Sequence, residues 1–272
     1  GRPPHEVYEL ARIRWNDVAR VIDERAAQEM QGTDWSLAPA LDMLHIDPDH
    51  PMRPEVVEAL LAFAPEPAAV AEAAATPGHG VPLAADMRTR DSYLDPAVDA
   101  ENRLTEFVPF PENAADQPAL WNIMLPHLGW MRTSALLLSF DARVALEAGD
   151  ADLFVARSES VMDLARQMSH DGFLISDLVA MALHGLACTE ISRALRDHTE
   201  ALSSEQLARL AHAIDASAGR VMNLGFETER LGARDVLQRS FTDNGRGSGR
   251  LVNESYGMIA SFGTEDFGPV PD

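Results

Sequence analysis

The sequence predicts an all-α protein, and three observations lead to that prediction. Ala, Leu, Arg, Glu and Met, all strong helix formers, dominate the chain. Aromatic residues make up only 6% of it, and no alternating apolar and polar segment is bounded by hairpin dipeptides. Apolar residues instead recur at helical spacing in several segments. With 272 residues the chain is long enough for one large domain, and we expect a single helical domain over 1–272.

The N-terminal part, residues 1–117, is predicted to form less regular helices and loops that wrap around the core. Helices are expected at 5–31, 55–63, 67–75 and 96–107. Gly32 ends the first of these helices. Pro54 stands directly ahead of the second, where a first-turn proline is favoured. Prolines are frequent from residue 77 onwards, so this stretch is the least regular part of the chain.

The core is predicted to be built from residues 118–241. Helices are expected at 119–147, 151–169, 173–198, 204–218 and about 223–241. Gly149-Asp150 separates the first two, and Ser203 with Gln206 forms a capping box ahead of the fourth. Residues 242–272 follow as a tail that contains Gly and Pro and does not continue the last helix.

Two core segments are apolar around nearly their full circumference, and we expect them to be central. They are 128–146 and 173–195. The helices at 151–169 and 204–218 have one apolar face each and are expected to flank the central pair. Short connections make consecutive helices antiparallel, so the predicted fold is a tetratricopeptide-like or irregular α-solenoid stack of helix hairpins.

One hairpin carries small residues at corresponding positions of its two helices. It runs from Ala142 through Gly149-Asp150 to Ala165 and resembles half of a tetratricopeptide-type repeat. A broader pattern extends over residues 15–252. Its segments are Trp35-Ser36-Leu37, EALLAFAPEPAAVAEAA, ARVALEAGDADLFVARSESVMDLARQMSHDGFLISDLVAMAL, LSSEQLARL and, most distinctively, ETERLGARDVLQRSFTDNGRGSGRL.

This order of segments is similar to a group of uncharacterised helical proteins that is abundant in planctomycete-type bacteria. The resemblance implies a helical fold and no assigned activity. Members of that group often carry an N-terminal hydrophobic anchor. It therefore also implies an extracytoplasmic or membrane-anchored location, through a segment ahead of residue 1.

The charge balance excludes several classes of partner. Asp and Glu number 43 against 22 basic residues, which gives a net charge of -21. All the basic residues are Arg, so no Lys nucleophile or phosphate-loop Lys exists. Nucleic acid and anionic membrane surfaces would repel such a chain. No run of about 18 apolar residues occurs, so the chain is not expected to insert into a membrane.

His184 and Cys188 share one face of a predicted central helix, four residues apart. Such a pair can hold zinc or act as base and nucleophile. Zinc needs further ligands, and no spacing ties His170 or His212 to the pair. We therefore expect a buried, unreactive thiol beside a core histidine. Cys188 is the only cysteine, which excludes an intramolecular disulfide.

The remaining candidate metal-binding and charged clusters lie in two loops and one helix. His45 to His50 places four potential ligands in a proline-bounded loop, which is usually a solvated turn. The Gly-rich segment 242–254 fits a calcium loop in neither register, because starting at Asp243 or Asn244 leaves key oxygen ligands missing. The helix at 223–241 carries a cluster of opposite charges. Its members are Glu227, Glu229, Arg230, Arg234 and Asp235.

The sequence assigns no catalytic, cofactor-binding or metal-binding residue. It contains no G-x-S-x-G, H-E-x-x-H, G-x-G-x-x-G or phosphate-loop motif. The prediction is a non-catalytic interaction or scaffold protein with a protein or peptide partner, no cofactor, and no structural metal needed for folding. The alternative is a metal-assisted hydrolase with its site near His184 and Cys188 or in the loop from His45 to His50.

Overall fold

The protein is mostly helical, which confirms the predicted all-α class. A computed structural model describes much of the chain. The described residues are 1–29, 53–54, 57–58, 65–78, 80–81, 86–89, 103–109, 125–198, 200–241 and 250. The helices are α1 (Pro4–Glu29), α3 (Pro65–Ala74), α4 (His127–Glu147), α5 (Ala151–Met168), α6 (Leu174–Asp197), α7 (Ser204–Val221) and α8 (Glu227–Ser240).

Two short strands pair beside the helices. They are β1 (Asp86–Thr89) and β2 (Thr105–Val108), which run antiparallel with Met87 opposite Phe107. The predicted helix at 96–107 is therefore wrong at its C-terminal end. Thr105, Phe107 and Val108 favour extended backbone, and the buried Glu9 carboxylate accepts hydrogen bonds from the Thr105 amide at 3.1 Å and its hydroxyl at 2.5 Å.

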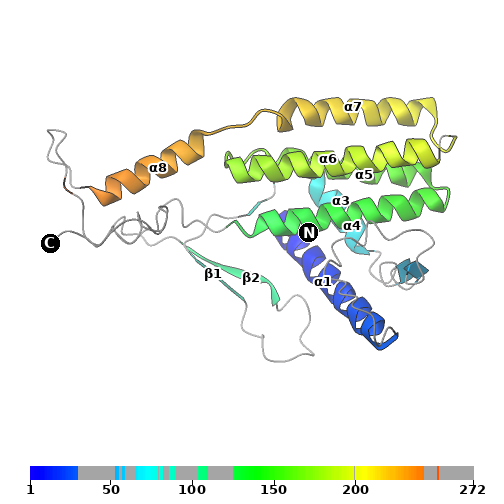
Figure 1. Cartoon of the computed structure of the whole chain (residues 1–272), viewed down its shortest axis with the longest axis horizontal. Coiled ribbons are helices and arrows are strands. Elements are labelled where there is room, and N and C mark those ends of the chain that lie inside the picture. The colour runs from blue at the N-terminus through cyan, green and yellow to red at the C-terminus, as the bar shows by residue number, and fades with distance from the viewer. Residues whose placement is uncertain are drawn as a thin grey trace.

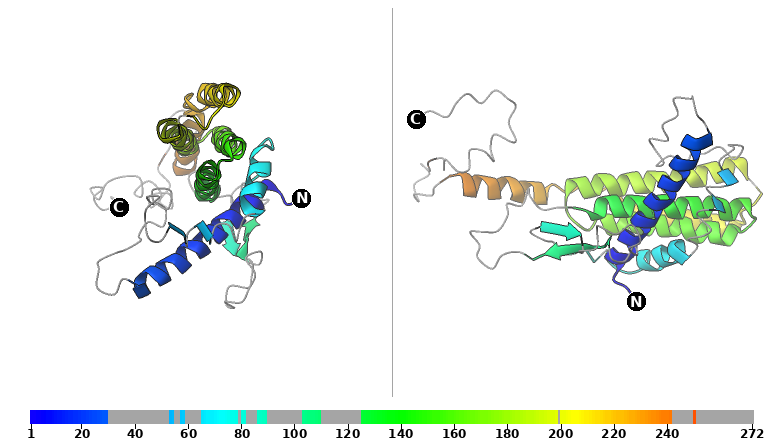
Figure 2. Two further views of the ribbon diagram at one scale, coloured as in Figure 1. Left: turned by 90° about the vertical axis from the view of Figure 1, so that its right-hand side faces the viewer. Right: turned by 90° about the horizontal axis from the view of Figure 1, so that it is seen from below.

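Helices α4 to α7 lie side by side in a bundle, with α1 crossing it and α3 against it (Figures 1 and 2). Consecutive helices of the bundle run in opposite directions because their connections are short. Gly149 takes φ +84° at the first connection, and the Asp150 side chain caps α5 by accepting from the Leu153 amide at 3.0 Å. The capping box of Ser203 and Gln206 opens α7 as predicted.

Three predicted helix starts differ from the structure. Helix α4 begins at His127, not at 119, and follows Pro126. Helix α8 begins at Glu227, not at 223, and residues 223–226, with Gly225 among them, have no regular secondary structure. The predicted helix at 67–75 begins two residues earlier, at Pro65. The predicted helix at 55–63 lies mostly outside the described residues.

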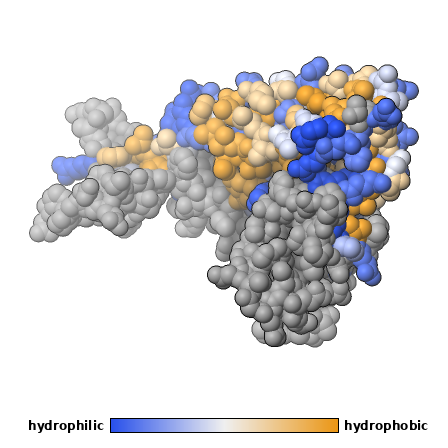
Figure 3. Space-filling view, turned by 45° about the vertical axis from the view of Figure 1, so that its right-hand side comes forward, coloured by the Kyte–Doolittle hydropathy of each residue, from blue (hydrophilic) through white to orange (hydrophobic). Residues whose placement is uncertain are grey.

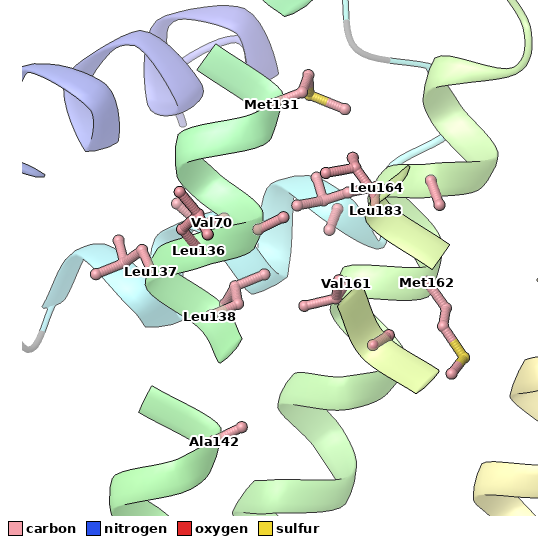
Figure 4. Packing of buried hydrophobic residues seen from close by; sticks show 14 of the residues in the cluster. Val70, Met131, Leu136, Leu137, Leu138, Ala142, Val161, Met162, Leu164 and Leu183 are labelled. Atoms are coloured by element: carbon pink, nitrogen blue, oxygen red, sulfur yellow. The ribbon is translucent and has the colours of Figure 1, made fainter. Parts of the chain in front are cut away.

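The predicted places of α5 and α6 are wrong. Helix α5 was expected to flank the core, yet it packs against α3, α4, α6 and α7. Helix α6 was expected to be central, yet one whole side of it faces outward. Helix α4 does lie in the core, and its inner side chains meet those of α3, α5 and α6 in Figure 4. The labelled residues there include Val70, Leu138, Val161, Met162, Leu164 and Leu183.

A buried glutamine joins the N-terminal helices to the bundle. Gln167 of α5 accepts a hydrogen bond from the Tyr8 hydroxyl at 2.8 Å. Its Nε2 donates to the carbonyls of Ala74 at 2.8 Å and Thr76 at 2.6 Å, at the end of α3. One side-chain amide thus satisfies backbone groups that the end of a helix leaves open.

Candidate interaction surfaces

The predicted pair on α6 lies at the interface with α7. His184 is buried, and its Nδ1 lies 3.1 Å from the Ser217 Oγ of α7. Its Nε2 lies 3.5 Å from the Cys188 Sγ. Cys188 is half-buried rather than buried as expected, and its expected lack of reactivity stays a prediction. Sequence reasoning missed Ser217, because nothing in the spacing of 33 residues links it to His184.

The electrostatics of this pair do not favour nucleophilic chemistry. Burial lowers the pKa of His184 below its ordinary 6.5 and raises the pKa of Cys188 above 9.0. Both shifts favour the neutral thiol and the neutral imidazole, whereas an activated cysteine needs a stabilised thiolate. Within the described ranges, no three His, Cys, Asp or Glu side chains gather as a metal centre requires.

The lowered pKa of His184 makes stability depend on pH. Below about pH 6.5 the unfolded chain takes up a proton at this residue that the folded protein resists. The free energy of unfolding should therefore fall as the pH drops from about 6.5, until the pH passes below the folded pKa. His184→Gln should lack this component, and urea unfolding over a pH series measures it. His212→Gln, at an exposed position of α7, is the control and should keep the wild-type slope.

The other predicted ligand clusters lie largely outside the described residues. This holds for the whole loop from His45 to His50. It also holds for the Gly-rich segment 242–254, of which only Arg250 is described. The expectation that the protein needs no structural metal stays a prediction.

A buried polar group that the sequence did not reveal joins α4 to the α5–α6 connection. His127 Nε2 lies 2.6 Å from Asp171 Oδ2, and the Ser176 hydroxyl donates to the same oxygen at 3.1 Å. The carboxylate stands between the serine and the histidine. The serine hydroxyl therefore donates to the carboxylate and not to the histidine, whereas a serine nucleophile of the triad type donates to a histidine. We interpret this group as a structural tie.

Helix α8 is joined to the bundle through its first turn and the connection before it. Glu229 accepts a hydrogen bond from the Leu174 amide at 2.5 Å, and Asp177 accepts one from the Gly225 amide at 3.0 Å. Beyond that turn α8 projects away from the bundle (Figure 1). It packs along none of the other described helices. The charged cluster predicted on this helix is thus divided. Glu229 contacts α6, whereas the ion pair of Glu227 with Arg230 is exposed to solvent.

Apolar side chains are exposed along α8 and at the bundle end from which it projects. Phe226 is 59% exposed, and Leu231 and Leu237 are 51% and 57% exposed. Met222, at the end of α7, is also exposed. We call Met222, Phe226, Leu231 and Leu237 the arm surface. The space-filling view shows apolar colour on α8 and on the adjoining part of the bundle (Figure 3).

The outward side of α6 forms a second apolar surface. From Ile175 to Ser192 its exposed positions are spaced alternately three and four residues apart, and Leu195, Arg196 and Asp197 are exposed beyond them. The alternately spaced positions are Ile175, Leu178, Ala182, Gly185, Thr189 and Ser192, and we call them the α6 stripe. By length and hydropathy α6 is the one described helix that meets the criteria for a membrane span, but 44% of that window is buried inside the protein. Core helices of soluble proteins meet the same criteria.

Comparisons with protein-family models, curated proteins and solved structures find no match to this chain. The similarity to the planctomycete-type group therefore remains an expectation from the sequence.

Proposed function

We propose that the protein is a non-catalytic interaction protein that binds a protein partner through the arm surface. The observation that carries the proposal is that α8 packs along none of the other described helices and exposes Leu231 and Leu237 beyond its first turn. Several large apolar side chains exposed near one another often mark a binding site. Together with Phe241, which is 42% exposed, the two leucines spread over about 15 Å of α8, a length that suits an amphipathic helix as the partner.

We also propose the finer fold assignment, a tetratricopeptide-like or irregular α-solenoid stacking of α4 to α7. Antiparallel order and short connections support it, and such stacks commonly present extended binding surfaces. The alternative function, a metal-assisted hydrolase, has less support. The pKa shifts of His184 and Cys188 oppose an activated thiol, and no third ligand joins them within the part of the chain that the structure describes.

Photo-crosslinking tests the proposed function. A benzophenone amino acid in place of Phe226, used in cells that express the protein, should give one discrete adduct with another protein. Leu231→Asp with Leu237→Asp should remove that adduct, because two carboxylates would have to be desolvated in the contact.

Leu207→Asp is the matched control, since Leu207 is an exposed leucine at the opposite end of α7. It should leave the adduct unchanged. If no adduct forms, or if the two arm substitutions leave it as strong as Leu207→Asp does, the proposed function is wrong. The same adduct identifies its partner by mass spectrometry.

A further inference from the structure

The α6 helix buries two carboxylates among its inward apolar residues and exposes large apolar side chains on its outward side. Asp177 and Glu190 are 3% and 6% exposed, whereas Ile175 and Leu178 are 46% and 47% exposed. Glu190 is turned inward to Arg143 of α4, at 2.6 Å. Burying charges and exposing leucine are both unfavourable. The arrangement is reasonable for a helix whose outer side is also covered.

The α6 stripe carries no charged side chain over about five turns. Its two hydroxyls are already used, because Thr189 donates to the Gly185 carbonyl at 2.8 Å and Ser192 to the Cys188 carbonyl at 2.7 Å. Four half-buried residues beside the stripe extend the uncharged surface, and the half-buried Arg193 is a charged side chain at its C-terminal end. The four uncharged residues are Val179, Met181, Leu186 and Cys188.

Gly185 adds an independent observation. It lies in the middle of α6, where glycine costs about 0.5–1 kcal/mol relative to alanine. A Cβ there would meet nothing within 4 Å, so no close contact among the described residues requires glycine. Small residues on an outward helix face allow the backbone of another helix to approach closely.

We propose that two copies of the chain associate through the α6 stripe, with the two α6 helices antiparallel. Alternating spacings of three and four residues suit helix pairs that cross at about 20°. In the antiparallel arrangement Ile175 lies opposite Ser192 of the second copy, and Leu178 opposite its Thr189. Ala182 then lies opposite Gly185, at the closest approach.

This pairing matches large side chains to small ones at both ends of the stripe. A parallel pair would instead place Ile175 on Ile175 and leave a gap at Gly185. The absence of charge on the stripe also explains how a chain of net charge -21 can meet its own copy. The remaining acidic surface acts at longer range, where salt screens it beyond about 8–10 Å. Two-fold dimers are the commonest oligomers, and they need such a self-complementary patch.

Sedimentation of the full chain across a wide concentration range tests the association. The wild type should form a dimer, and Gly185→Leu should raise the dissociation constant by about tenfold or more. The substitution should not harm the fold, because the space around Gly185 is open and leucine is the better helix former. Gly219→Leu is the matched control, at an exposed α7 glycine with equally open space, and it should leave the dimer intact.

Cysteine crosslinking tests the orientation. In a Cys188→Ser background, Ile175→Cys with Ser192→Cys should give a disulfide-linked dimer. The two positions lie about 25 Å apart on one helix, so the bond must join two chains. Ser192→Cys alone should not crosslink, and a crosslink there would overturn the antiparallel arrangement in favour of a parallel one.

Three results overturn the proposal itself. They are a monomer at every concentration, a dimer that Gly185→Leu leaves as tight as Gly219→Leu does, and a monomer that floats with neutral phosphatidylcholine vesicles. The last would assign the stripe to lipid. The dimer is independent of the proposed partner binding, because the arm surface and the α6 stripe are tested by separate substitutions.

Discussion

Glu190→Ala should lower the free energy of unfolding by about 3–5 kcal/mol. The Glu190 carboxylate receives Arg143 at 2.6 Å and Arg193 at 3.2 Å, and its side chain is almost fully buried. Removal of the carboxylate leaves the largely buried Arg143 guanidinium of α4 without that counter-charge. Urea unfolding followed by circular dichroism measures the loss.

The double variant Arg143→Met with Glu190→Leu separates charge from packing. Apolar side chains of similar size often replace a buried ion pair without cost, so this variant should recover most of the loss. Arg230→Ala removes a solvent-exposed ion pair with Glu227 and should change little. A double variant as unstable as Glu190→Ala would contradict the explanation.

Leu183→Ala should lower the free energy of unfolding by about 2–5 kcal/mol, because Leu183 is buried against α4 and α5 and its truncation leaves a cavity. Leu178→Ala, the same change on the outward side of α6, should cost no more than about 0.5 kcal/mol. Both are best measured in the Gly185→Leu background, which separates folding from association.

The two substitutions together test how α6 is rotated in the bundle. Equal losses at Leu183 and Leu178 would mean that α6 is surrounded on all sides within one chain. That is what the apolar pattern of the sequence predicts, and it is the prediction that the structure contradicts.

The hairpin boundaries of the bundle were predictable because their signals are local. Gly149 with Asp150, and Ser203 with Gln206, form turns and caps from residues a few positions apart. The strand at Thr105 was not predictable in this way. Its pairing with β1 and its contact with Glu9 depend on segments distant in sequence.

The candidate surfaces were only partly predictable. The apolar character of α6 is evident in the sequence, but a pattern cannot say which side of a helix its neighbours cover. The attachment of α8 to the bundle depends on a hydrogen bond from the Leu174 amide to the Glu229 carboxylate, and these residues are 55 positions apart. The ties at His127 with Asp171, and at Arg143 with Glu190, likewise join helices through single contacts that leave no periodic signal.

The way α8 leaves the bundle has a kinetic consequence. A helix of 14 residues is marginal in water by itself, and α8 packs along none of the other described helices. Its winding and unwinding are therefore only weakly coupled to the cooperative unfolding of α4 to α7. A partner that binds α8 must also fix its helical conformation. The entropic cost of this ordering weakens the affinity for a given contact area. Such an attachment suits a complex that associates and dissociates quickly, rather than a permanent assembly.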